Sequence, residues 1–158
     1  MVKSGVKTVK SGEKGGKPML YGRYEHTVDS KNRMFVPAKF KEELGGSFKL
    51  TYNDFNKCIL VYSDLEWAKY EQKIAQLPSL QFDDFIREIY SNTVDVQTDA
   101  QGRIVLPSFL KDKVNIEKNV LVMGVGTHAE IWAQEVFEDK SKKVDMNKIK
   151  ELMMELGF

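Results

Sequence analysis

Two short motifs place a carboxylate and a guanidinium at the same spacing. Asp29 lies four residues before Arg33, and Asp99 lies four residues before Arg103. A guanidinium on a rigid turn can offer two parallel donors to guanine O6 and N7 or to a phosphate, and a nearby carboxylate can hold it in place. The same spacing is also common for an ion pair that only pins a turn. From these residues alone the structural ion pair is the favoured interpretation, and DNA contact is the alternative.

Lysines accompany the first motif more closely than the second. Lys31 lies inside the first turn, and Lys39 and Lys41 follow it in the next predicted helix. The second motif has Gln101 where the first has Lys31. If the motifs contact DNA, the first motif is therefore predicted to be the more basic of the two. Taken singly, each lysine is more typical of a solvated surface.

Both motifs belong to an internal repeat with an offset of 70 residues. Residues 29–37 and 99–107 share Asp, Arg and Pro, with apolar residues at the three positions between Arg and Pro. We expect the match to continue without a gap as far as Trp67 and Phe137. It then pairs Phe40 with Leu110, Leu44 with Val114, Leu50 with Val120, Val61 with Ile131, and Tyr62 with Trp132. A repeat of this length changes the prediction of the whole fold.

Each copy predicts strand, turn, strand, short helix, strand, strand. Residues 24–28 and 94–98 are short and β-prone, and turn formers follow them. Gly102 can adopt the positive φ that such a turn often requires, and Asn32 is the next most tolerant residue type. Pro37 and Pro107 suit the first position of a helix. The expected helices cover 38–44 and 108–114, and the expected later strands cover 48–52, 58–62, 119–124 and 130–132.

A unit of about 45 residues is too small for a stable core of its own, so the copies should share one. We predict one barrel with pseudo-two-fold symmetry, in which the strands of the two copies interleave and cover each other's edges. Amphipathic patterns predict helices at 64–76, at 82–90 and from residue 145 onwards. These helices are expected to pack on the barrel, and the last of them could equally pack on a neighbouring subunit.

The composition is that of an ordinary globular protein. The chain has 158 residues, 42% of them apolar and 30% charged, with one cysteine. No apolar run is long enough to span a bilayer and no export signal is evident, so a cytoplasmic location is expected, without a membrane partner. Residues 1–18 hold five lysines and one glutamate and are predicted to be a disordered basic extension. The remainder is mildly acidic although the whole chain is +1, so composition alone does not indicate nucleic acid.

Enzyme chemistry has little support in the sequence. His26 and His128 are the only histidines, and Cys58 is the only thiol. Neither a metal-spaced cluster nor a phosphate-binding glycine loop nor a nucleophile elbow is present. We therefore predict that the chain is not an enzyme, with no cofactor, no metal and no small-molecule substrate.

Residues 19–158 resemble the MraZ family. The segments that carry the resemblance are 19–33, 99–103, 125–126, 130–132 and 155–158. The resemblance implies an α+β fold with a mainly β core, an AbrB-like swapped-hairpin barrel formed by two pseudo-symmetric repeats, and flanking helices. The first repeat with its linking helices then covers 19–92, and the second repeat with the C-terminal helix covers 93–158. The chain departs from the family at Asn32, where glycine is usual, and in the extension before Met19.

The resemblance also implies a function. MraZ proteins are bacterial transcriptional regulators that assemble into homo-oligomeric rings. They bind tandem short repeats in double-stranded DNA upstream of the division and cell-wall gene cluster, which usually begins with their own gene. A nucleoid-associated location follows. The alternative is a ring-forming assembly protein without specific DNA binding.

The family's Asp-x-x-x-Arg motif corresponds to Asp29 and Arg33 and to Asp99 and Arg103 in this sequence. With the resemblance, DNA contact becomes the favoured role of Arg33, whereas for Arg103 the two roles stay balanced. The predicted DNA-binding residues are Arg33, Lys31, Asp29, Arg103, Asp99, Lys39 and Lys41.

Overall fold

The structure, a computed structural model, describes residues 19–158, so the predicted extension over 1–18 lies outside the described residues. The elements of the first copy are β1 (Arg23–Thr27), β2 (Arg33–Phe35), α1 (Ala38–Leu44), β3 (Ser47–Thr51), β4 (Ile59–Ser63), α2 (Asp64–Ala75) and α3 (Ser79–Ser91). Those of the second are β5 (Val94–Gln97), β6 (Arg103–Val105), α4 (Ser108–Lys113), β7 (Asn119–Gly124), β8 (Ala129–Ala133), α5 (Gln134–Lys142) and α6 (Met146–Glu155). The predicted α+β class with a mainly β core is confirmed.

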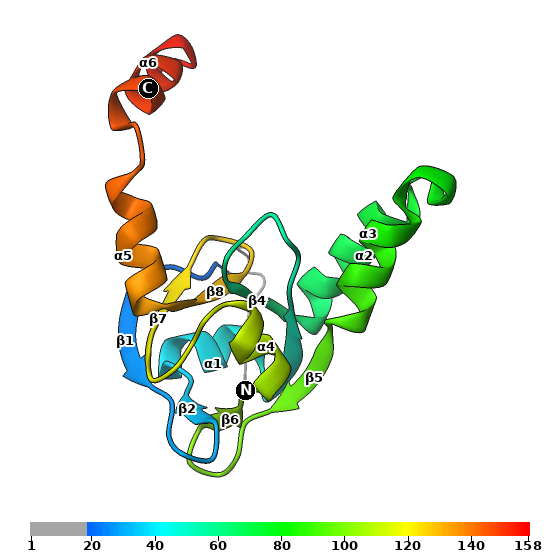
Figure 1. Ribbon diagram of the computed structural model, residues 1–158, viewed down its shortest axis with the longest axis vertical. Helices are drawn as coiled ribbons and strands as arrows, with labels where there is room; N and C mark the ends of the chain where they lie inside the picture. The colour runs from blue at the N-terminus through cyan, green and yellow to red at the C-terminus, as the bar shows by residue number, and fades with distance from the viewer. Residues whose placement is uncertain (1–18) are drawn as a thin grey trace.

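Strands of both copies form one six-stranded antiparallel sheet with the order β1-β7-β8-β4-β3-β5. The first strand of each copy pairs with a strand of the other: β1 with β7, and β5 with β3. The short strands β2 and β6 pair with each other and form a separate two-stranded ribbon at one end of the molecule (Figure 1). In each copy, the first two strands therefore pair only with strands of the other copy.

Two strand pairs lie on the pseudo-two-fold axis. In β4·β8 the central pair is Leu60 and Glu130, and in the β2·β6 ribbon it is Met34 and Ile104. In both cases the paired residues are equivalent members of the repeat. Both registers are therefore self-complementary, as in a contact between two identical units.

The repeat contains a two-residue shift that the ungapped alignment misses. Leu50 faces Val61 in the first copy, whereas Val122 faces Ile131 in the second. Because Val61 and Ile131 are equivalent, Leu50 corresponds to Val122, and the predicted pairing of Leu50 with Val120 is wrong.

Two connections cause this shift and then cancel it. The link from helix to strand covers 45–46 in the first copy and 114–118 in the second. The following hairpin loop is the longer one in the first copy, at 52–58, and the shorter one in the second, at 125–128. The repeat is therefore back in register at β4 and β8.

The core occupies both faces of the sheet. On β4, Ile59 and Val61 pack with the ribbon, α1 and α4, whereas Leu60 and Tyr62 pack beneath α2, α3 and α5. The alternation follows from the period of two in a strand. Since both faces of β4 are covered, its side chains are apolar almost throughout, with Cys58 fully buried beside it.

A close backbone approach is specific to the second copy. Leu20 and Gly126 exchange two backbone hydrogen bonds of 2.7 and 2.8 Å beside the end of β7. A Cβ at Gly124 would lie 2.3 Å from backbone atoms of Leu20 and Tyr21, so only glycine fits there.

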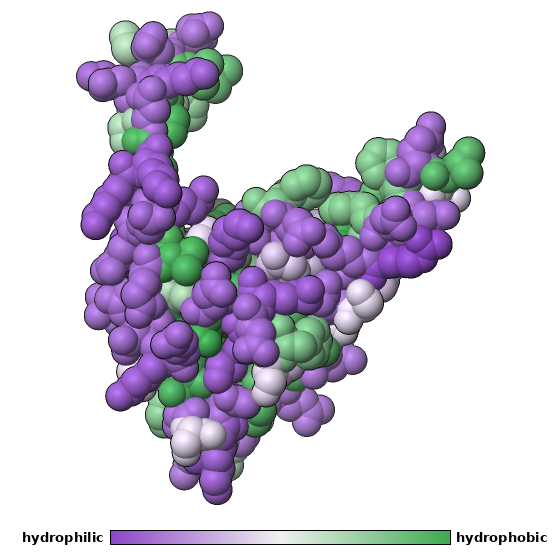
Figure 2. Space-filling view, in the orientation of Figure 1, coloured by the Kyte–Doolittle hydropathy of each residue, from purple (hydrophilic) through white to green (hydrophobic). Residues whose placement is uncertain are grey.

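The helices α2–α3 and α5–α6 form two arms that project from the sheet (Figure 1). No residue of α6 is buried, and Ile149, Leu152 and Met153 are exposed. Figure 2 shows apolar surface on this arm. The expectation that the last helix packs on the body of its own chain is wrong, because the segment that follows α5 directs α6 away from the sheet.

Candidate functional site

The two Asp-x-x-x-Arg motifs form matching turns. The backbone N–H of Asn32 donates to the carbonyl of Asp29 at 3.0 Å, and that of Gly102 donates to Asp99 at 3.0 Å. Asn32 has φ 62° and Gly102 has φ 82°. The left-handed conformation favours glycine and tolerates asparagine, which explains the residue types at these positions. The predicted positive φ is therefore confirmed at both turns.

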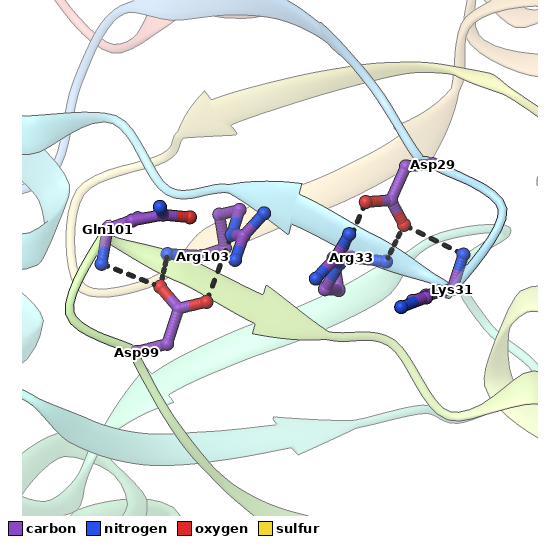
Figure 3. A network of polar contacts seen from close by, with 6 residues as sticks. All are labelled: Asp29, Lys31, Arg33, Asp99, Gln101 and Arg103. Atoms are coloured by element: carbon purple, nitrogen blue, oxygen red, sulfur yellow. Dashed lines mark hydrogen bonds and ion pairs between the residues drawn. The ribbon is translucent and has the colours of Figure 1, made fainter.

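Each aspartate holds its turn through three hydrogen bonds. Asp29 Oδ1 accepts from the backbone N–H groups of Lys31 and Arg33, both at 2.9 Å, and Asp29 Oδ2 accepts from Arg33 Nε at 2.8 Å. Asp99 makes the same contacts with Gln101 and Arg103, all at 2.9 Å (Figure 3). The structural ion pair is thus present in both copies.

These contacts lower the pKa of both carboxyl groups. For Asp29 the largest cause is the backbone hydrogen bond from Arg33, and the side-chain hydrogen bond and charge of Arg33 add to it. Asp99 has a lowered pKa for the same reasons, through Arg103. Both carboxylates are therefore ionised at neutral pH and act only as acceptors.

The ion pair occupies only one edge of each guanidinium. Arg33 and Arg103 use Nε for their aspartates, and no side chain among residues 19–158 accepts a hydrogen bond from their Nη1 or Nη2 atoms. A guanidinium can bind one acceptor through its Nε edge and another through its terminal nitrogens. A turn-pinning ion pair and a contact with a ligand are therefore compatible in the same arginine.

The ribbon presents both arginines on one surface. Met34 and Ile104 point into the core, so Arg33, Phe35, Arg103 and Val105 lie on the opposite face. We call these four residues the ribbon face. Figure 3 places the two motifs at opposite ends of the paired strands. A two-stranded ribbon can enter the major groove of B-form DNA.

The predicted lysines fall into different places. Lys31 is exposed on the first turn, next to Arg33. The Lys39 ammonium lies 3.6 Å from the centroid of the Tyr21 ring, and its hydrogen bond with Tyr21 raises the pKa of Lys39. Lys41 is partly exposed on the same helix, α1.

Helix α1 follows a segment that lies against the second turn, because the backbone N–H of Val36 donates to the Gly102 carbonyl at 3.0 Å. Their sequence positions suggested that Lys39 and Lys41 lie beside the first turn. The helix that carries them instead follows a segment bonded to the second turn. The lysine that contacts the first turn is Lys111 from α4, whose Nζ lies 2.6 Å from Asn32 Oδ1. Sequence reasoning missed Lys111, although the repeat pairs it with Lys41.

The residues that could have supported other chemistry lie elsewhere. Cys58 is fully buried, which raises the pKa of its thiol. His128 stacks on Tyr62 with a centroid distance of 4.8 Å, and burial lowers its pKa. Over residues 19–158 no group of three or more His, Cys, Asp or Glu side chains could hold a metal ion. In the same range, no helix has both the length and the apolar character needed to cross a membrane.

A family model and individual relatives place the chain in the same protein family. The family model described as "MraZ protein, putative antitoxin-like" matches residues 19–84 and 89–155. A Caldanaerobacter subterraneus subsp. tengcongensis protein named "Transcriptional regulator MraZ" is 46% identical over 131 residues, which cover 82% of this chain and 91% of that protein. A Clostridium tetani protein of the same name is 40% identical over 143 residues, which cover 89% of this chain and all of that protein.

Proposed function

Because this chain belongs to the MraZ family, we propose that it is a transcriptional regulator that reads DNA sequence through the ribbon face. The observation that carries the proposal is the pair of fixed arginines, each held at Nε by an aspartate and each with its terminal nitrogens unbound by residues 19–158. A pre-oriented guanidinium can make the bidentate contact to guanine O6 and N7.

The ribbon face also provides apolar contact. Phe35 is 51% exposed and Val105 is 57% exposed, on strands whose intervening residues are buried. Apolar side chains in the major groove can contact the methyl group of thymine. We propose that Lys31 and Lys41 contact phosphates, and that Lys39 does so from its position over Tyr21. Asp29 and Asp99 position the arginines and do not touch the bases.

We further propose that the targets are tandem short repeats upstream of the division and cell-wall gene cluster, including the regulator's own gene. The family resemblance supports this target and a cytoplasmic, nucleoid-associated location. The exchange of β1 and β5 between the copies supports the AbrB-like swapped-hairpin barrel. The chain is then a binding protein and not an enzyme.

The proposal includes a homo-oligomeric ring. The exposed apolar residues of α6 favour self-association, since surfaces of this kind are often interaction sites. Several copies of the ribbon face on one assembly would bind a repeated operator with avidity when their spacing matches the repeats. Light scattering at micromolar concentration should report an oligomer. A monomer that binds its operator with full affinity would contradict the ring.

A gel-shift assay with the DNA immediately upstream of the gene tests the DNA-reading role. We expect specific binding that survives excess scrambled DNA of equal length. An oligomer that shows no preference for upstream DNA would instead support the alternative, a ring-forming assembly protein without specific DNA binding. The exposed apolar surface of α6 is the observation that favours that alternative.

A further inference from the structure

The first turn makes three hydrogen bonds with the second copy. Lys111 Nζ donates to Asn32 Oδ1 at 2.6 Å, and Asn32 Nδ2 donates to Ser108 Oγ at 3.2 Å. The backbone N–H of Leu106 donates to the Asn32 carbonyl at 2.7 Å. Both side-chain partners lie on α4, more than 70 positions away in the chain. Asn32 therefore joins the turn of one copy to the helix of the other.

The second turn has only the backbone part of this arrangement. The N–H of Val36 donates to the Gly102 carbonyl at 3.0 Å, which matches the Leu106 contact. Gly102 has no side chain, and Ala38 stands where α4 has Ser108. Lys41, the counterpart of Lys111, therefore has no amide at this turn to bind. Within residues 19–158, the side-chain contacts exist in the first copy alone.

We infer that Asn32 and Lys111 are positioning residues for Arg33, an inference that rests on the proposed DNA-reading function. Asn32 immediately precedes Arg33 and is the turn residue with positive φ. Fixing its amide to α4 restricts the backbone from which Arg33 projects, so less conformational freedom is lost when Arg33 meets a base. Lys111 acts through Asn32, and its contact with DNA is not required.

A double-mutant cycle tests this. The variants are Lys111→Met, Asn32→Gly and the double variant. Glycine keeps the positive φ and removes the Asn32 side chain with both of its bonds to α4. The readout is the ratio of affinities for the upstream DNA and for a scrambled duplex. Each single change should lower this ratio about three- to tenfold, the range expected for one hydrogen bond. The double variant should lose no more than Asn32→Gly alone, because Asn32→Gly already removes the contact that Lys111→Met removes, together with the bond to Ser108.

Two matched controls use the other copy. Lys41→Met removes the same charge from the equivalent position and should reduce affinity for both duplexes alike. Gly102→Asn places an amide in the second turn, where Lys41 could bind it. An added Cβ at Gly102 meets no atom within 4 Å. Hydrogen exchange provides a readout without DNA: the Arg33 amide should exchange faster in Lys111→Met and in Asn32→Gly, while the Arg103 amide stays unchanged.

The possible outcomes are separable. If Lys111→Met lowers the ratio as much in the Asn32→Gly background as in the unaltered chain, Lys111 contacts DNA itself and the inference is overturned. An unchanged ratio in both single variants also overturns it. If the unaltered protein does not distinguish the two duplexes, the DNA-reading function itself fails. Should Lys111→Met not fold, Ser108→Ala removes the other side-chain bond to Asn32 and should lower the ratio in the same direction.

Discussion

The two turns have the same Asp–Arg geometry but make different contacts with the rest of the molecule. Their six matching hydrogen bonds to aspartate differ by no more than 0.1 Å. Around them, Asn32 binds α4 through its side chain, whereas Gly102 makes no side-chain contact. The comparison shows that the motif forms the same local geometry in two different surroundings, and we assign the rigidity of the first turn to its additional contacts.

The surroundings of the arginines differ as well. Arg103 lies opposite Phe35 across the ribbon, with its guanidinium 6.0 Å from the ring centroid, whereas Arg33 lies opposite Val105. The Arg103 side chain is 22% exposed and the Arg33 side chain 31%. Arg33 is therefore the more accessible of the two.

The largest effect should come from separating the copies. In residues 19–92 alone, β1 would lack β7, β2 would lack β6 and β3 would lack β5. We expect this half to be unfolded or to be an obligate dimer that restores the missing pairs. Circular dichroism during heating, together with light scattering, would measure this. A stable monomer with a sharp thermal transition would show that the copies do not need each other.

The next largest effect should follow from Gly124→Ala, at a close approach found only in the second copy. The new Cβ would lie 2.3 Å from the backbone of Leu20 and Tyr21, which cannot rotate away. Unfolding in denaturant should show a loss of about 1–3 kcal/mol. Gly46→Ala is the matched control, since no atom lies within 4 Å of its Cβ position, and it should change stability by less than about 0.5 kcal/mol. Equal effects of the two variants would contradict the close approach.

The third prediction compares the arginines directly. Arg33→Ala should weaken binding to the upstream DNA by about 1–3 kcal/mol, the value of one bidentate base contact. Arg103→Ala should have the smaller effect, because that side chain is less exposed and packs near Phe35. Fluorescence anisotropy with labelled DNA measures both. Thermal stability should change little, because exposed ion pairs contribute little to the free energy of unfolding.

Arg33→Lys is the stricter variant, because it keeps the charge and loses the planar fork. A folded Arg33→Lys protein that binds as tightly as the unaltered chain would show that only charge matters at this position. A larger loss for Arg103→Ala than for Arg33→Ala would reverse the assignment of the main reader.

The smallest effect concerns pH, where the two copies should behave alike. Contacts with Arg33 and Arg103 lower the pKa of Asp29 and Asp99 in the folded state. The stability from these contacts is therefore fully present above the unfolded aspartate pKa, near 4, and is lost as the pH falls through the lower folded pKa. NMR titration of the two carboxyl groups should give values below the ordinary one. Asp29→Asn should remove this dependence in the first turn only, and an ordinary pKa for either group would contradict the observed contacts.

Local features of the fold were predictable from sequence, and long-range ones were not. The turns at Asp29 and Asp99 follow from turn-forming residues that are neighbours in the chain. The equivalence of Leu50 and Val122 was missed because a strand has a period of two, so a shift by two residues leaves the same side chains facing the core.

The surroundings of the candidate site follow the same rule. The contact between Asn32 and Lys111 was missed because it joins residues 79 positions apart, on elements whose relative placement depends on the exchange of strands. Neither amphipathic pattern nor composition specifies the direction of α6, since an apolar stripe shows that a helix needs a partner and not where the partner lies.

The self-complementary registers of β4·β8 and β2·β6 are those of an isologous dimer, yet here one peptide chain contains both halves. In a dimer of single copies, every substitution would appear twice, and Asn32 would stand in both turns. When both halves lie in one chain, a residue of one half can be substituted while its counterpart in the other half stays unchanged. The two halves of this chain do differ at equivalent positions, with Asn32 against Gly102 and Lys31 against Gln101. Under the proposed DNA-reading function, the two halves of the bound site can therefore differ in sequence.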